Sequence, residues 1–304
     1  MPTPFPPVAI ALVLGAACTH AAWNLVVKQA AEDRELVTWL ALGVGGVLLA
    51  PALTHAWTAV ATAWPFVTAS AAAEAAYVVL LTAAYRSADL SVVYPVARGT
   101  APLLLALWTS VFLGQVPRRG GMLGIAMLAA GVIMVASTAV NGRRGPDTAD
   151  GTTMSGTVSG RRRAWVDIAL TLGVALCIST YSAVDGAAMR RVPPAAYEGA
   201  VFVLGAVMTT PFVVGRDGGR RVRDVLRRRW RRTLVVGVAM AGAYVAILRA
   251  FSLAPIAYVG ATREVSIVIA ALAGWRALGE PFRINRLIGS AVIVAGIAAI
   301  LLLG

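Results

Sequence analysis

Charged residues stand inside long apolar stretches of this sequence, where a charged side chain needs a specific reason. Six of them are Glu74, Arg98, Asp185, Arg249, Arg263 and Glu264. A charge at the centre of a bilayer costs at least ~2.5–3.5 kcal/mol on insertion scales, so such residues line polar pathways or pair with one another. An arginine suits an anionic group, and a carboxylate can balance charge or carry a proton.

Helical spacing gives some of these charges polar neighbours, because residues three or four positions apart lie on one helix face. Glu74 thus shares a face with Tyr77, Arg98 with Tyr94, and Asp185 with Tyr181, while His20, Asn24 and Lys28 share a face near the N-terminus. We predict that Arg98 and Arg263 contact the substrate and that Glu74, Asp185 or Glu264 balances charge or carries a proton. The residues predicted to shape the cavity are Trp23, Asn24, Tyr77, Tyr94, Tyr181 and Tyr244.

A fixed ionic core is the structural alternative for the same charges. In that case Arg98 or Arg249 pairs with Glu74, and Arg263 pairs with Glu264 or Asp185. The sequence leaves both interpretations open for each charged residue taken alone.

The surroundings of Arg98 predict a kinked or broken helix. Pro95 and Pro102 flank it and remove helical hydrogen bonds, and Gly99 loosens the backbone. A broken helix is tolerated within a membrane only where it is buried or lines a wet cavity. The pattern fits an arginine that must reach an anionic group.

The helices that position these residues are long enough to cross a membrane. Hydrophobic residues make up 59% of the 304 residues and charged residues only 13%, far from the composition of a soluble domain. About 20 apolar residues cross a hydrocarbon layer of ~30 Å. Ten stretches qualify: 8–27, 36–53, 66–86, 90–113, 121–139, 165–189, 197–214, 233–253, 256–275 and 284–303. They are too long and too rich in Ala and Leu for barrel strands, so the predicted fold is an all-α integral membrane protein with ten transmembrane helices.

The unusual polar residues are not evenly distributed over these ten spans. Spans 1, 3, 4, 6, 8 and 9 carry them, whereas spans 2, 5, 7 and 10 carry almost none. We therefore expect the first group to surround a polar cavity and the second group to face lipid or a partner.

The two halves of the sequence repeat each other. Leu113-Gly114-Gln115 recurs as Leu278-Gly279-Glu280, and Arg118, Gly124 and Gly131 recur as Arg283, Gly289 and Gly296, with Arg98 falling opposite Arg263 or Glu264. Two copies of an odd number of spans insert in opposite orientations, as in many transporters. We predict two inverted five-helix repeats, 8–139 and 165–303, joined by a flexible polar linker at 140–164. The matched glycines at seven-residue spacing favour close helix packing or a homodimer contact.

Other features exclude several functions. The sequence has two histidines, no nucleophile motif, no phosphate-binding loop and no metal-ligand spacing, so we expect neither an enzyme nor a cofactor. The basic residues 216–232 are a loop or a short surface helix beside anionic lipid rather than a nucleic-acid site. Residues 8–19 could form the core of a signal peptide, but no basic residue precedes them and no clear cleavage site follows, which favours a retained first span. Most basic residues fall in the loops after odd-numbered spans, which predicts that those loops are cytoplasmic and both termini outside.

Three motifs carry a resemblance to a known family. They are Thr19-His20-Ala21-Ala22-Trp23-Asn24 followed by Lys28; Ala84-Tyr85-Arg86-Ser87-Ala88 leading to Tyr94-Pro95-Val96-Ala97-Arg98-Gly99; and the paired turns Gly114-Gln115 and Gly279-Glu280-Pro281. With these motifs the chain resembles the ten-span EamA-type branch of the drug/metabolite transporter superfamily. The resemblance implies a secondary carrier that works by alternating access, often coupled to protons or exchange, with a central cavity lined by spans 1, 3, 4, 6, 8 and 9. Similar proteins are often drawn with both termini in the cytoplasm, in contrast to the loop charges here.

These observations lead to one functional expectation. We expect a carrier of small organic metabolites, zwitterionic or anionic, in the bacterial inner membrane. Its expected partners are the small-molecule substrate, the lipid bilayer, a coupling proton and a second copy of the chain, and not nucleic acid. Proton-coupled efflux of cationic drugs and a non-transporting receptor or assembly protein are the alternatives. The acidic residue that small multidrug carriers hold in their first span is missing, which counts against the first alternative.

Overall fold

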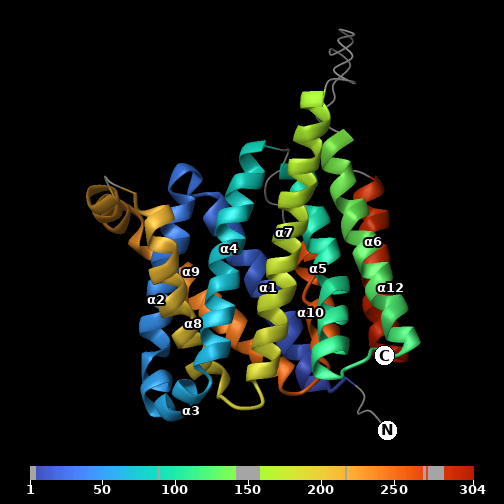
Figure 1. The fold of residues 1–304 in the computed structure, drawn as a ribbon, viewed down its shortest axis with the longest axis horizontal. Helices are drawn as coiled ribbons and strands as arrows, with labels where there is room; N and C mark the ends of the chain where they lie inside the picture. The colour runs from blue at the N-terminus through green and yellow to red at the C-terminus, as the bar shows by residue number, and fades with distance from the viewer. Residues whose placement is uncertain (1–4, 88–89, 142–157, 216–217, 270–271, 273–283) are drawn as a thin grey trace. The chain divides into compact units, whose positions relative to one another are not determined.

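The computed structural model describes residues 5–87, 90–141, 158–215, 218–269, 272 and 284–304, and every regular element in them is a helix. The helices are shown in chain order in Figure 1. Their bounds are α1 Pro7–Lys28, the 3₁₀ helix η1 Ala31–Asp33, α2 Arg34–His55, α3 Trp57–Thr62, α4 Trp64–Ser87, α5 Leu90–Leu113, α6 Arg119–Asn141, α7 Val158–Ala188, α8 Pro194–Val213, α9 Gly218–Phe251, α10 Ile256–Thr262 and α12 Ile284–Leu303.

The helices follow the predicted spans because apolar residues run for membrane length in each and the backbone bonds to itself. Within the described residues, seven helices are long and apolar enough to cross a membrane, and the apolar parts of α6 and α12 are shorter. The protein is therefore an all-helical, multi-pass membrane protein. The count of ten spans and the inverted repeat stay predictions. The turn at Gly279–Pro281 and residues 142–157 of the predicted linker lie outside the described residues.

Four local features differ from the sequence predictions. A short helix, α3, lies between the second and third spans, and α7 begins at Val158, inside the predicted linker. The basic segment is a helix, which is one of its two predicted forms, but it continues directly into a span as α9, with a bend at Arg229. Of the kink or break predicted at Arg98, the break is wrong, since α5 runs unbroken from Leu90 to Leu113, and the kink stays a prediction. Instead, the chain breaks in the ninth span, where α10 ends at Thr262 and a turn follows.

The glycine next to Arg98 serves helix packing rather than a break. A β-carbon at Gly99 would lie 3.0 Å from the Ala129 carbonyl oxygen and 3.1 Å from Ile133 Cγ1 on α6. The small residue thus lets α5 approach α6 closely.

The helices form two compact units, each of which draws on both halves of the sequence. The first unit comprises Met1–Ala75 and Thr180–Leu272, and the second comprises Ala76–Ser179 and Ala273–Gly304. The sequence halves 8–139 and 165–303 are therefore not the compact units. A sequence repeat need not coincide with a packing unit, so this division does not test the repeat. In the first unit α2 packs on α8 and α9, and α1 packs on α9; in the second, α6 packs on α5 and α12.

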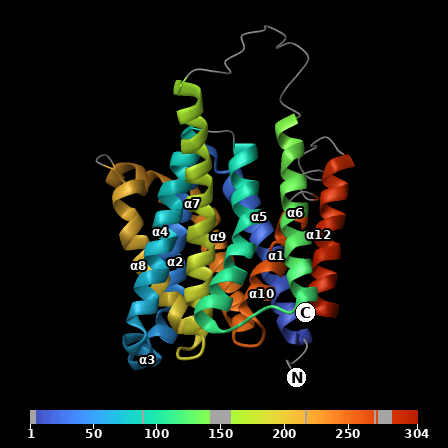
Figure 2. The same ribbon diagram turned by 45° about the vertical axis from the view of Figure 1, so that its right-hand side comes forward.

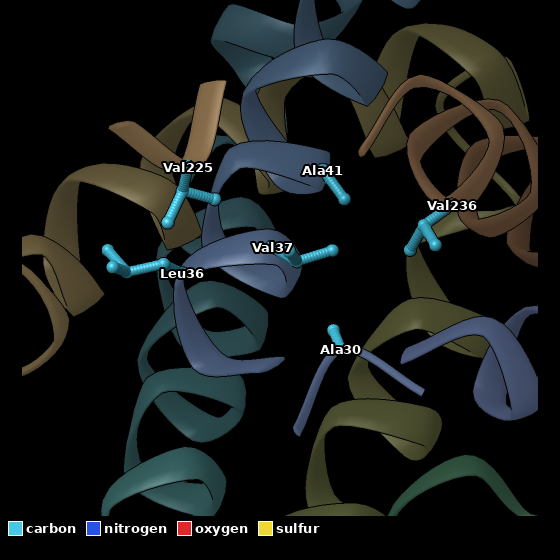
Figure 3. Packing of buried hydrophobic residues seen from close by; sticks show 6 residues of the cluster. All are labelled: Ala30, Leu36, Val37, Ala41, Val225 and Val236. Atoms are coloured by element: carbon cyan, nitrogen blue, oxygen red, sulfur yellow. The ribbon is translucent and has the colours of Figure 1, made fainter. Parts of the chain in front are cut away.

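An apolar cluster in the first unit holds the basic part of α9 in place. It consists of Ala30, Leu36, Val37, Ala41, Val225 and Val236, all buried, as Figure 3 shows. Val225 comes from the basic segment and is fully buried, so this segment presents one apolar face to α2 and the opposite face to solvent or lipid headgroups. The bend at Arg229 lies where its Nε atom is 2.7 Å from Asp33 Oδ2.

Glycines form the contact between α6 and α12 in the second unit, two helices that lie side by side in both Figure 1 and Figure 2. A β-carbon at Gly124 would lie 2.6 Å from the Gly296 carbonyl oxygen, and one at Gly131 would lie 2.7 Å from that of Gly289. No side chain fits at these distances, so only glycine allows the approach. The matched glycines of the two sequence halves are therefore used in packing within one chain.

Candidate functional site

Asp185 is the centre of the polar site in the first unit. It lies near the end of α7 and is fully buried. The Tyr197 hydroxyl of α8 donates a hydrogen bond to Oδ1 at 2.7 Å, and the Tyr244 hydroxyl of α9 donates a short hydrogen bond to Oδ2. The connection between α7 and α8 is short and Pro193 directly precedes α8, so Tyr197 comes within reach of the end of α7. Three helices thus meet at one carboxylate.

Tyr197 has a second acceptor on another helix. Its hydroxyl oxygen is 3.2 Å from the Phe66 carbonyl oxygen, in the first turn of α4. The tyrosine is itself fully buried. The hydroxyl therefore links α4, α7 and α8 at one point.

Arg263 lies at the break that ends α10. Its Nη2 atom donates to Ser182 Oγ at 3.1 Å, and its guanidinium carbon is 5.8 Å from the centroid of the Tyr181 ring. Its Nε atom is 3.8 Å from Glu264 Oε1. Tyr181, Ser182 and Asp185 share one face of α7, and the charge of Arg263 acts on Asp185. Glu264, one of the two carboxylates that the ionic-core alternative offers to Arg263, thus forms an ion pair with it, at a long distance.

Two further glutamates belong to this site. Glu74 of α4 is partly exposed and lies against α8, where a β-carbon at Gly205 would be 3.9 Å from its Oε2 atom. It interacts electrostatically with Asp185 and Arg263. Glu198 of α8 is fully buried and interacts electrostatically with Glu74 and Asp185. We call Glu74, Asp185 and Glu198, together with Tyr197, Tyr244 and Arg263, the acidic cluster.

The acidic cluster contains more negative than positive groups. Three carboxylates act on one another, and Arg263 is the cation that acts on Glu74 and Asp185. Among the described residues no group of three or more His, Cys, Asp or Glu side chains is arranged to hold a metal ion. Buried carboxylates need compensation by hydrogen bonds, a proton or a cation. The arrangement can accept a proton, a positively charged ligand group, or both.

The predicted site residues separate into two sets. Glu74, Asp185, Tyr181, Tyr244, Arg263 and Glu264 come together in the first unit. Arg98, which is buried, and Tyr77, which is half-buried, belong to the second unit. Arg249, the alternative partner of Glu74, is exposed.

Three other predicted residues have different surroundings. Trp23 packs against the apolar cluster of α2 and α9, and its ring lies edge-on to His20 with centroids 4.8 Å apart. Asn24 donates from Nδ2 to the His20 carbonyl oxygen at 2.8 Å, within its own helix. The side chains of Tyr94 and Lys28 lie outside the described residues.

Tyr197 and Glu198, and with them the role of α8, were not predicted from the sequence. This helix was expected to carry almost no polar residues and to face lipid or a partner, which is wrong for its first turns. Both residues sit at the predicted end of a span, where polar residues are common. The helix begins three residues earlier, at Pro194, and proline at a first helical position was the available signal.

Comparisons with known proteins bear on the fold and on part of the sequence. Residues 165–302 match the sequence model of the EamA-like transporter family. Among curated proteins there is no match. A solved structure described as "Crystal structure of protein" is 18% identical, with a TM-score of 0.72, over 97% of this chain and 96% of that chain. At this identity the likeness shows the fold alone.

The match covers α7 to α12, and it therefore includes Asp185, Tyr197, Glu198, Tyr244 and Arg263. Residues 165–302 are thus similar to the EamA-like transporter family, which belongs to the drug/metabolite transporter superfamily.

Proposed function

We propose that this protein is a secondary transporter that moves small organic metabolites across the bacterial inner membrane by alternating access. Zwitterionic or anionic substrates are preferred. The similarity to the EamA-like transporter family supports the transport role, and the substrate class rests on the surroundings of Arg263.

Arg263 is the observation that carries the substrate class. The helix break at Thr262 places its guanidinium group beside Ser182 and the Tyr181 ring, and its Nε atom is 3.8 Å from Glu264 Oε1, a loose ion pair. A guanidinium group binds a carboxylate or phosphate through paired hydrogen bonds. A substrate carboxylate can therefore replace the loose ion pair with a closer one.

The neighbouring acids favour a zwitterion within this class. Glu74 and Glu198 lie in the same unit and interact with each other. A substrate with an ammonium group near its carboxylate would present a positive end to these acids and a negative end to Arg263. Arg98 is the proposed anion contact of the second unit, and Glu264 balances the charge of Arg263.

An organic cation is the second candidate substrate. The specific observation in its favour is the excess of carboxylates over arginine in the acidic cluster. Cation binding would use Glu74 and the tyrosine rings and would not depend on Arg263.

The test is thermal unfolding of the detergent-purified protein with a panel of amino acids, organic acids, phosphonates and organic cations. A ligand at about 100 times its Kd stabilises the folded protein by about 2.7 kcal/mol. We expect a stabilising amino acid or anion whose effect disappears in Arg263→Gln. The matched control is Arg249→Gln, which removes an exposed arginine of α9 and should leave the effect unchanged. Stabilisation by organic cations alone, retained in Arg263→Gln, would overturn the zwitterion and favour the second candidate.

A further inference from the structure

Glu198 has a set of contacts unlike those of the other acids. Its side chain is fully buried one turn inside α8. Neither carboxylate oxygen accepts a hydrogen bond from any part of the chain that the structure describes. Burying an ionised carboxylate without donors or a cation costs several kcal/mol. A carboxylate in this position needs a positive partner.

The helices packed around α8 do not supply that partner among the described residues. The charges that act on Glu198 come from Glu74 of α4 and Asp185 of α7, and both are acids. Tyr197 donates its proton to Asp185, and so does Tyr244 of α9. The face of α2 that meets this turn of α8 is apolar, since Leu49 lies opposite Gly199. Arg263 donates to Ser182 and acts on Glu74 and Asp185.

Asp185 is equally buried but well compensated. Two tyrosine hydroxyls donate to its two oxygens, and the positive charge of Arg263 acts on it. Such donors stabilise the ionised form of a carboxylate, whereas burial without donors stabilises the protonated form. When two neighbouring acids lie in such contrasting environments, one carries the proton and the other stays ionised.

We propose that Glu198 is the proton-binding site of this carrier, with Asp185 remaining ionised beside it. The proton adds to a Glu198 carboxylate oxygen, which becomes a neutral acid, and leaves as a proton through the partly exposed Glu74. A proton needs no set of coordinating side chains. This agrees with the lack of a metal-binding group among the described residues. Its role in coupling rests on the proposed transport function.

The experiment is infrared spectroscopy of the purified protein without substrate. A protonated carboxylic acid has a carbonyl stretch above the amide I band, which an ionised carboxylate or a glutamine lacks. At neutral pH we expect this band in the wild type, a shift of the band in D₂O because the proton exchanges, and loss of the band in Glu198→Gln. The matched control is Glu35→Gln, because Glu35 is an exposed acid of α2 and its loss should leave the band unchanged. A band that persists in Glu198→Gln, or a wild type without the band, would overturn the proposal.

A second measurement tests the proposal if the Glu198→Gln protein does not fold. If folded Glu198 keeps a proton that an exposed glutamate has lost, the folded state binds more protons than the unfolded state. The free energy of unfolding of the wild type then falls as pH rises. Glu198→Asp, which keeps a carboxyl group, should retain both the band and this slope. A wild-type stability that does not fall with pH would overturn the proposal. Neither readout needs a substrate. If no ligand of the panel stabilises the protein but the infrared band is present, the result counts against the transport proposal alone.

Discussion

In the second unit, α6 and α12 meet through Gly124, Gly131, Gly289 and Gly296, and the space between the helices is too small for a methyl group. In the first unit, α7, α8 and α9 meet through Asp185 and two tyrosine hydroxyls. The first contact depends on shape and the second on hydrogen bonding. The second unit should therefore be sensitive to added volume, and the first to lost donors, acceptors and charge.

The pairing of glycines between α6 and α12 is related to the predicted repeat. Gly124 of the first half meets Gly296 of the second, and Gly131 meets Gly289, whereas the sequence matches Gly124 with Gly289 and Gly131 with Gly296. A twofold axis through the contact would produce this exchange of partners. The pattern supports the predicted repeat, and it gives these glycines a role that needs no second copy of the chain.

The largest effect is expected from added volume at the glycine contact. Gly131→Val places a branched side chain where a β-carbon alone would be 2.7 Å from a backbone oxygen, so the helices must separate. Overpacking of this kind costs about 3 kcal/mol. Thermal unfolding in detergent measures the loss. The control is Gly43→Ala, because a β-carbon there meets nothing within 4 Å; replacement of a helical glycine should stabilise α2 slightly. Equal stabilities of the two variants would mean that α6 and α12 do not touch through glycines.

An intermediate effect is expected from loss of the shared carboxylate. Asp185→Ala removes the acceptor of two tyrosines, of which Tyr197 can still donate to Phe66 and Tyr244 loses its acceptor. An unsatisfied buried hydroxyl costs about 2 kcal/mol. Asp185→Asn keeps one acceptor oxygen and should lose about half as much stability, while transport should fail in both variants because the charge beside Arg263 is gone.

The same thermal unfolding and transport assays test this prediction, with Asp224→Asn as the control. Asp224 is an exposed acid on the basic segment of α9, and its loss should change neither stability nor transport. An Asp185→Ala protein as stable as the wild type would show that the hydrogen bonds at Asp185 do not hold the helices together.

Most helices were predictable from the sequence, because membrane length and apolar composition depend only on neighbouring residues. The helix at 34–55 contains the predicted span 36–53, and α12 has the bounds of the predicted span 284–303. The pairing of charges on different helices was not predictable, because it depends on which helices pack together. The predicted repeat places Arg98 opposite Arg263 or Glu264, yet Arg98 lies in an unbroken helix and the other two residues lie at a break.

Burial of single side chains was the other quantity that the sequence did not reveal. Trp23 and Asn24 looked like cavity residues from their type, and they pack on an apolar cluster or bond within their own helix. Glu198 stands at the predicted end of a span and was not singled out, yet it is fully buried and no described residue donates a hydrogen bond to its carboxylate. Residue type identified the candidates, but the packing of α8 decided which of them are buried.

The smallest effect is expected at the ion pair between Asp33 and Arg229. This pair tests the effect of charge without full burial. Its side chains are 18% and 28% exposed, although Arg229 Nε and Asp33 Oδ2 are only 2.7 Å apart. Solvent screens such a pair, so a double-mutant cycle with Asp33→Asn and Arg229→Gln should give a coupling of about 0.5 kcal/mol. The bend of α9 should survive, because Val225 still anchors the basic segment in the apolar cluster. A coupling as large as the loss in Asp185→Ala would mean that charge, and not burial, causes the sensitivity of the first unit to mutation.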